Sequence, residues 1–221
     1  MDKLKIITQL DFFSELTPIQ IEELSTISNL ITYPKDSILY YEDEEKDNIL
    51  FLVGGLIKIY KIDKFENEIF LYHIYKNSMI SELTSINNNS IYCFSNAEFV
   101  EDSTVLSINF DKFKEMFLSK NILSYKLIET LLDKTHQLQC IVNRELVFDA
   151  TAKVAFMLYN DIEMFNKLKR QEVSFMLHIQ PETLSRVLKR LTRNGAIAVE
   201  KGDVNILNKN QLESTFKGVG I

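Results

Sequence analysis

The stretch that decides the fold runs from Arg170 to Leu191 and reads RQEVSFMLHIQPETLSRVLKRL. Its apolar residues recur at helical spacing, which predicts a short helix over 171–177, a turn, and a second helix over 181–194. Pro181 suits the first turn of the second helix, and Gly195 suits the position just after its end. The stretch is therefore predicted to be a helix-turn-helix held together by its apolar side chains.

The polar face of the second predicted helix has the composition that reading a DNA major groove requires. An acidic side chain can accept from cytosine N4, a cation can donate to guanine O6 and N7, and small side chains fit beside thymine methyl groups. A solvated surface helix would have a similar composition, so the pattern alone leaves both interpretations open. The residues of this face are Glu182, Thr183, Ser185, Arg186, Lys189 and Arg190.

The charge distribution favours DNA contact at the C-terminal end of the chain. The whole protein has a net charge of −6. Residues 149–221 nevertheless carry 11 Lys and Arg against 8 Asp and Glu, whereas residues 1–148 carry 14 against 23. An acidic body with a mildly basic C-terminal region suits a DNA-binding protein whose larger part has another task.

Upstream of this region, helical and β-rich segments alternate. Residues 1–30 are predicted to be helical, with Thr17-Pro18 opening a helix. Short apolar runs separated by polar turns then predict an antiparallel sandwich or barrel. Gly54-Gly55 is expected to form a tight hairpin, because such turns need positive φ. The expected strands are 37–41, 49–53, 56–62, 68–75, 91–100 and 104–108.

A long helix is predicted over 122–143, followed by a helix over 150–165 and a β-hairpin that turns at 201–203. One stripe of the long helix has the near-heptad spacing of a coiled-coil seam, which favours pairing with a second copy of the chain. Packing on its own β-rich domain is the alternative. Ile128 and Leu132 beside the stripe indicate a second buried face. The stripe consists of Leu123, Leu127, Leu131, Leu138 and Val142.

These patterns resemble a known family. RQE at 170–172 followed by ETLSRVL at 182–188 resembles the DNA-binding motif of the CRP/FNR superfamily of bacterial transcription regulators. LVFDATAKVAFML at 146–158 resembles that family's hinge and first winged-domain helix, and FLVGGLIKIY at 51–60 resembles its β-roll hairpin. Ser81-Glu82-Leu83 resembles the effector cassette, with serine in place of glycine.

The resemblance covers nearly the whole chain and implies an α+β fold. It implies a β-roll sensor domain over 1–118, similar to the jelly roll that binds cyclic nucleotides. A dimerisation helix and hinge would follow over 119–147, with a hinge near 143–149. A winged helix-turn-helix domain would occupy 148–221. The implied partners are double-stranded DNA, a second copy of the chain and RNA polymerase.

The resemblance also implies roles for single residues. Glu182, Ser185 and Arg186 would contact base edges, and their spacing is similar to the FNR branch, which implies a palindromic operator with TTGA-like half-sites. Pro181 replaces the arginine of the cyclic-AMP receptor branch. The expected phosphate contacts, which contribute affinity without sequence information, are Arg170, Thr183, Lys189, Arg190 and Arg193.

The sensor pocket is expected around Glu82, Leu83, Ile91 and Tyr92. Ile91-Tyr92 stands where cyclic-nucleotide binders of the family have an Arg-Ser or Arg-Thr pair, and the first arginine of the chain is Arg144. A buried phosphate needs a cation, so cyclic AMP and cyclic GMP are disfavoured. Cys93 and Cys140 lack cluster spacing and are expected to be core thiols, which argues against an iron–sulfur cluster.

The sequence does not identify the effector. Haem is one alternative, with His73 as a candidate axial ligand, although an ordinary strand histidine is the simpler interpretation. An apolar effector and no effector at all are the others. We expect no catalytic site, no structural metal, no membrane span and a cytoplasmic protein. The alternative functions are a cyclic-nucleotide-like regulatory module that does not bind DNA and a scaffold protein.

Overall fold

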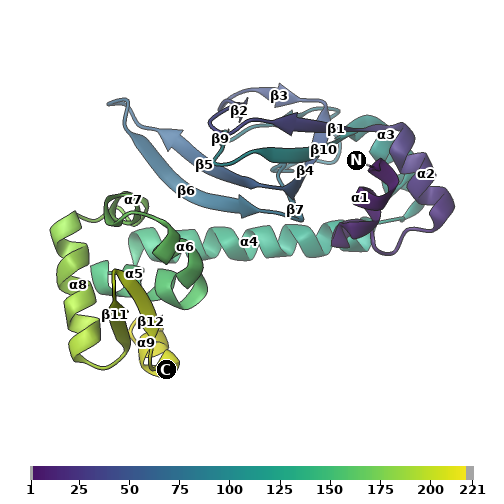
Figure 1. The fold of residues 1–221 in the computed structure, drawn as a ribbon. Helices are drawn as coiled ribbons and strands as arrows, with labels where there is room; N and C mark the ends of the chain where they lie inside the picture. The colour runs from purple at the N-terminus through teal and green to yellow at the C-terminus, as the bar shows by residue number, and fades with distance from the viewer. Residues whose placement is uncertain (1, 218–221) are drawn as a thin grey trace. The chain divides into compact units, whose positions relative to one another are not determined.

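The computed structural model describes residues 2–217, and the chain forms two compact units (Figure 1). The first extends to Gln137 and the second begins at Leu138. The division falls within the long helix α4 (Ser124–Leu146). The resemblance had implied that this helix forms a segment of its own, over 119–147, between the two domains. No helix in the described part of the chain is long and apolar enough to cross a membrane.

The N-terminal segment is helical, as predicted. It contains α1 (Lys3–Gln9), the 3₁₀ turn η1 (Asp11–Phe13) and α2 (Pro18–Thr26). Thr17 and Gln20 form a capping box at the start of α2, where Pro18 takes the first helical position. Pro18 costs nothing there, because the first amides of a helix have no partner within the helix. The helical region ends earlier than predicted, since β1 begins at Ser28.

The middle of the chain is an antiparallel sandwich, which confirms the predicted architecture. In residues 2–217 it has two four-stranded sheets, ordered β1-β10-β4-β7 and β2-β9-β5-β6. The first sheet consists of β1 (Ser28–Tyr33), β10 (Ser103–Asn109), β4 (Asn48–Gly54) and β7 (Ser78–Met79). The second consists of β2 (Ile38–Tyr40), β9 (Asn96–Phe99), β5 (Leu56–Ile62) and β6 (Glu68–Tyr75). The predicted strand over 91–100 is interrupted, because β8 (Ile91–Tyr92) pairs separately with β3 (Glu45–Lys46).

The expected hairpin at Gly54-Gly55 is wrong. The strands on either side belong to different sheets, so the two glycines carry the chain across the sandwich. Gly55 does have positive φ, at 101°, and a Cβ atom placed there would lie 1.9 Å from Ser103 Oγ. Glycine is therefore required at position 55 because the backbone there lies close to Ser103 of β10 where the chain crosses between the sheets. The hairpin of the second sheet is instead β5–β6, whose turn Asp63 closes by accepting from the backbone amides of Phe65 and Asn67.

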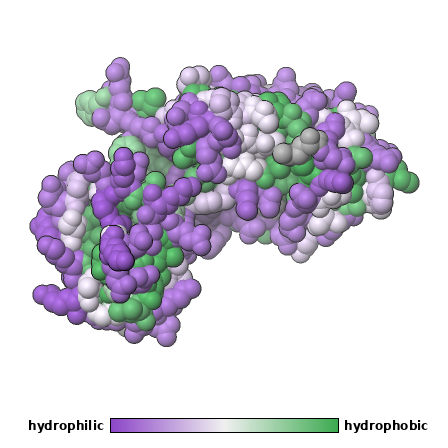
Figure 2. Space-filling view, in the orientation of Figure 1, coloured by the Kyte–Doolittle hydropathy of each residue, from purple (hydrophilic) through white to green (hydrophobic). Residues whose placement is uncertain are grey.

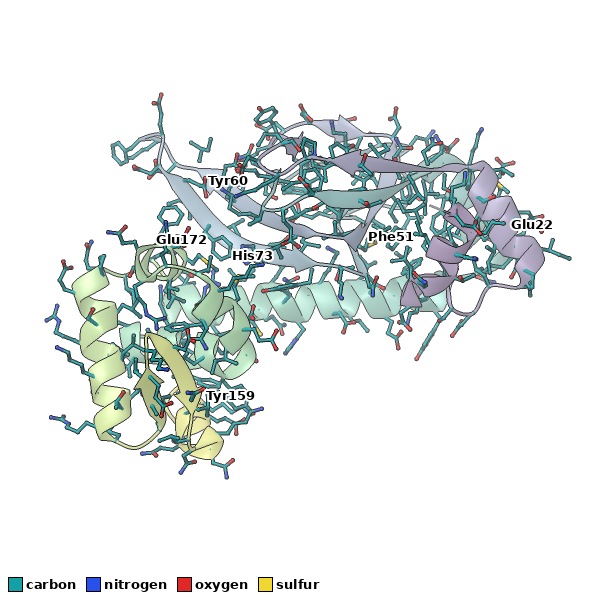
Figure 3. All side chains as sticks on the ribbon, in the orientation of Figure 1. Glu22, Phe51, Tyr60, His73, Tyr159 and Glu172 are labelled. Carbon is teal, nitrogen blue, oxygen red and sulfur yellow. The ribbon has the colours of Figure 1, made fainter. Side chains whose placement is uncertain are left out.

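Two apolar clusters stabilise the first unit. One lies within the sandwich and contains Leu52, Ile59 and Phe99. The other joins the N-terminal helices to α3 (Phe110–Met116) and the start of α4, and it includes Phe51, labelled on β4 in Figure 3. The 3₁₀ turn η2 (Leu118–Lys120) connects α3 toward α4.

The second cluster contains part of the stripe of the long helix that was expected to face a second copy. Leu123 and Leu127 are only 5% and 3% exposed and belong to this core, and Leu131 packs against it. Leu123 precedes α4 and has φ of 63°. All three residues therefore contact their own unit, and Leu123 and Leu127 are buried in it. Leu138 and Val142, farther along, are exposed.

The second unit is a small helical domain with one hairpin (Figure 1). The predicted helix over 150–165 is divided into α5 (Ala150–Asn160) and α6 (Ile162–Lys167). The break lies at Asp161, whose carboxylate caps α6 by accepting from the Met164 amide at 3.1 Å. The remaining elements are α7 (Arg170–Met176), α8 (Pro181–Arg193), β11 (Ile197–Glu200), β12 (Asp203–Ile206) and α9 (Lys209–Ser214).

Candidate nucleic-acid interface and sensor interior

The predicted helix-turn-helix is confirmed as α7, a turn and α8. The turn residue His178 has φ of 52°, and its amide donates to Phe175 O at 3.0 Å. Pro181 takes the first position of α8, and Gly195 follows its end with φ of 75°. Both ends of α8 are thus set by residues whose backbone preferences match the position.

Helix α8 has two distinct faces. Its inward face is apolar and buried, which fixes how the helix crosses the rest of the unit; it consists of Leu184, Val187, Leu188 and Leu191. Its outward face consists of Glu182, Ser185, Arg186, Lys189, Arg190 and Arg193, all exposed, with Thr183 half-buried beside them. The margin of the unit that carries α8 is accordingly hydrophilic in Figure 2. The structure brings all the predicted base-contact residues to one face, with an excess of positive charge.

A β-hairpin wing stands beside α8. Strands β11 and β12 pair through Lys201-Gly202, and both of these residues have positive φ, as a two-residue turn of this type requires. Arg170 holds this turn: its guanidinium donates to Gly202 O and lies 4.6 Å from the Phe165 ring centroid. The structure thus gives Arg170 a positioning role, and a phosphate contact would have to use its remaining N–H groups.

An exposed apolar stripe runs along α4 on the side away from the first-unit core. Its residues alternate in spacing between three and four, which is the spacing of a coiled-coil seam. The apolar members are Tyr125, Ile128, Leu132, Val142 and Leu146, and the intervening Thr135 and Gln139 are also exposed. This stripe lies next to the predicted one and shares only Val142 with it.

Glu82 lies in the first unit, after β7. Its Oε1 accepts from the Tyr72 hydroxyl at 2.7 Å, and burial together with this carboxylate raises the pKa of Tyr72. Its Oε2 is buried and has no hydrogen-bond partner among the described residues. A buried carboxylate oxygen without a donor is costly, so this atom marks a polar point in the interior.

The other predicted pocket residues are not gathered around Glu82. Leu83, Ile91 and Tyr92 line a separate pocket of about 30 Å³. That volume holds about one water molecule. The residues present also do not fit a cyclic phosphate chemically, because the chain has no arginine before Arg144.

A larger cavity of about 360 Å³ lies between β6, β7 and the first half of α4. It is lined by His73, labelled on β6 in Figure 3, and by Lys126, Thr130, Asp133 and Lys134. The His73 ring lies 4.9 Å from Phe70, centroid to centroid. The structure therefore places the haem candidate at a cavity wall.

Sequence reasoning missed Tyr72 and Lys134 as interior neighbours of Glu82. The Lys134 ammonium donates to Ile80 O at 3.5 Å, and the negative charge of Glu82 favours the protonated form of this lysine. Burial lowers the pKa of Lys134 to about 8, although Glu82 opposes the shift. Helical spacing could have found this residue, because Lys134 follows Leu127 by two turns and so lies on the buried side of α4.

The two cysteines are free thiols in different units. Cys93 is buried in the first unit, and Cys140 belongs to the second. Burial raises the pKa of the Cys93 thiol to about 11, which keeps it protonated and a poor metal ligand. Within residues 2–217, no group of three or more His, Cys, Asp and Glu side chains is placed to hold a metal ion.

Comparison with known families matches both units. A cyclic nucleotide-binding domain model matches residues 30–120, and a Crp-like helix-turn-helix domain model matches residues 152–215. The chain is also 22% identical over 199 residues to the anaerobic regulatory protein of Bacillus subtilis (strain 168), covering 85% of this chain and 83% of that protein.

Solved structures share the fold. A CooA variant from Carboxydothermus hydrogenoformans has a TM-score of 0.71 at 16% identity, covering 98% of this chain and 96% of that chain. FixK2 from Bradyrhizobium japonicum has a TM-score of 0.66 at 17% identity, covering 88% of this chain and 100% of that chain. At such identities the likeness concerns the arrangement of the elements alone.

Proposed function

The chain belongs to the CRP/FNR superfamily of transcription regulators, and from this premise we propose that it acts as a homodimer that reads a palindromic, TTGA-like operator through α8. The single observation that carries the proposal is the outward face of α8. There an acid, a small hydroxyl side chain and an arginine stand exposed within little more than one helical turn; they are Glu182, Ser185 and Arg186. This combination can read base edges directly.

The base-reading residues are proposed to act with surrounding cations. Glu182 accepts from a cytosine amino group, and Arg186 donates to guanine O6 and N7. Arg186 Nε donates to the backbone carbonyl of Glu182, one helical turn earlier, at 3.3 Å. Thr183, Lys189, Arg190 and Arg193 bind phosphates and set the register without reading sequence.

The exposed stripe of α4 is the proposed dimer interface. Ile128, Leu132 and Leu146 would pack against the same residues of a second copy in a two-fold arrangement. Two recognition helices could then enter successive major grooves, about one helical turn of DNA apart. A cytoplasmic location and a contact with RNA polymerase follow from the same proposal.

The test is a fluorescence-anisotropy titration of the full chain against a palindromic TTGA duplex and a scrambled duplex of equal length. Specific binding at physiological salt should exceed scrambled binding by at least about a thousandfold. Arg186→Ala should relax the preference at one base pair, whereas Lys189→Ala should weaken binding to both duplexes equally. Equal binding of the wild-type chain to both duplexes would contradict the proposed readout.

A haem-sensing regulator of the same fold is a second candidate, favoured by the position of His73 at the 360 Å³ cavity. A neutral imidazole is a common iron ligand, and haem would supply the gas-binding centre when bound. The absorbance spectrum of the purified protein with added haem tests this candidate. His73→Ala should abolish a haem band that the wild-type protein shows, and a spectrum identical to free haem in both proteins would exclude it.

A further inference from the structure

A compact ionic network joins the end of α4 to the turn of the helix-turn-helix. Glu145, in the last turn of α4, accepts from Arg144 Nε at 2.6 Å through Oε1. Its Oε2 accepts from Lys153 Nζ at 3.0 Å and lies 2.9 Å from His178 Nδ1. One carboxylate therefore contacts α4, α5 and the turn between α7 and α8.

The network is largely removed from solvent. The side chain of Lys153 is 9% exposed, and those of Glu145 and His178 are about a quarter exposed. Burial alone would raise the pKa of Glu145, but the hydrogen bonds from His178, Arg144 and Lys153 lower it to about 2. The carboxylate therefore stays charged, and each of its hydrogen bonds is charge-assisted.

The same network fixes the backbone from which α8 starts. Lys153 donates a second hydrogen bond to Leu177 O at 3.2 Å, at the end of α7. His178 is the next residue, and it is held in the left-handed region at φ of 52°. Non-glycine residues adopt this conformation at a cost and need surrounding contacts to hold it. Pro181 begins α8 only three residues later, so the turn sets the direction of the recognition helix.

We infer that Glu145 is a positioning residue that fixes the recognition helix α8 to the C-terminal end of α4, through Lys153 and His178. The inference rests on the proposed function and extends it: α4 carries the dimer seam, so Glu145 sets the separation of the two recognition helices. An operator whose half-sites lie at another separation is then disfavoured by the rigidity of this joint. The network thereby selects operator spacing and leaves base identity to α8.

Removing the charge should leave the fold intact. The link between α4 and α5 is also held by backbone hydrogen bonds from Val147 and Phe148 to Asn143 O, at 2.9 and 3.0 Å. The Phe148 ring packs 5.6 Å from the Phe156 ring, centroid to centroid. Glu145→Gln keeps the side-chain shape, and His178→Asn keeps a residue that tolerates positive φ while shortening the side chain. The first variant removes the charge at the centre of the network, and the second removes the imidazole that contacts it from the turn.

The first measurement is hydrogen exchange on the full-length protein without DNA. In Glu145→Gln and in His178→Asn, amides of the turn over 177–180 should exchange at least about tenfold faster, because a charge-assisted hydrogen bond is lost. Amides of α5 should be unchanged. Glu163→Gln, which removes an exposed acid of the same unit, is the matched control and should leave the turn as in the wild type. Unchanged exchange at 177–180 in both network variants would overturn the inference.

The second measurement compares a single half-site duplex with palindromic duplexes of standard spacing and of spacing increased by one and two base pairs. Glu145→Gln should lose about tenfold in affinity at standard spacing and show a flatter dependence on spacing. Its affinity for the single half-site should stay within twofold of the wild type. Equal losses on all duplexes would overturn the inference. A wild-type chain that binds no duplex would instead refute the proposed function, and the exchange result would still decide the role of Glu145 as a joint.

Discussion

Replacing Lys134 by methionine should remove a pH dependence of stability that the wild-type sensor unit shows between pH 8 and 10.5. Burial lowers the pKa of this lysine from 10.5 to about 8. In that window the unfolded chain binds the proton and the folded chain does not. The free energy of unfolding of the wild type therefore rises with pH until both states are neutral, above 10.5.

The size of the effect follows from the shift. A change of one pKa unit corresponds to about 1.4 kcal/mol, so the shift from 10.5 to about 8 corresponds to about 3 kcal/mol across the window. Methionine fills a similar volume and carries no charge. The free energy of unfolding of the Lys134→Met protein should therefore change less with pH. The difference in this free energy between the two proteins should be largest below pH 8.

The assay is urea unfolding followed by circular dichroism at several pH values from 7 to 11. Lys126 is the matched control, because it lies two turns earlier on α4 and has a pKa raised by its hydrogen bonds with Asp11 and Glu129. Lys126→Met should lower stability at neutral pH and leave the rise between pH 8 and 10.5 in place. Parallel profiles for the wild type and Lys134→Met would refute the reasoning that burial lowers the pKa of Lys134.

Four further outcomes are expected. Arg186→Ala should cost about 1–3 kcal/mol of operator binding at one base pair, measured by titration of single-base operator variants. Gly55→Ala should destabilise the sensor unit by more than about 2 kcal/mol in thermal unfolding, because its φ is 101° and its Cβ would overlap Ser103. Acid unfolding should show the depressed pKa of Glu145. The contribution of this carboxylate to the free energy of unfolding is complete above pH 4.5 and is lost as pH falls toward 2. Glu145→Gln should therefore lower the free energy of unfolding by about 1–2 kcal/mol at pH 7 and leave it unchanged at pH 2. Leu132→Lys should yield a monomer in sedimentation, whereas a dimer of unchanged affinity would exclude the α4 stripe as the interface.

The recognition helix was predictable because its signals are local. Pro181, Gly195 and the alternation of Leu184 and Leu188 with charged residues fix its ends and its two faces within one short stretch. The strands β5 and β6 were found with their observed bounds for the same reason, since each is a run rich in β-branched and aromatic residues between polar turns. Local preference and tertiary packing agree at these places.

The faces of α4 were not predictable by the same means. Two apolar stripes run side by side on this helix, one through Leu127 and Leu131 and the other through Ile128 and Leu132. Spacing identifies both, but only the tertiary fold decides which stripe the sensor unit buries. The prediction took the first for the dimer seam, but the structure packs its N-terminal part, from Leu123 to Leu131, against the core of the first unit. The prediction of a hairpin at Gly54-Gly55 was wrong for a related reason, because positive φ is needed both at a hairpin and at a crossing between sheets.

The interior neighbours of Glu82 could also not be predicted from the sequence. Tyr72 comes from β6 and Lys134 from α4, and neither lies within a motif that includes Glu82. Contacts between residues far apart in the chain are set by sheet order and helix packing. Glu82 itself was found because it stands in a recognisable tripeptide.

The sharing of α4 between the two units determines where the protein can be cut. A fragment beginning at Asp149 would retain α5 to α9 but would leave the Lys153 ammonium buried without the carboxylate of Glu145. Losing the partner of a buried charge is destabilising. This fragment should therefore be less stable than one that keeps Glu145, by about the 1–2 kcal/mol expected for Glu145→Gln, although it contains the entire winged helix-turn-helix. Starting instead at Leu138, where the second unit begins, keeps the last turns of the helix and the acid they carry.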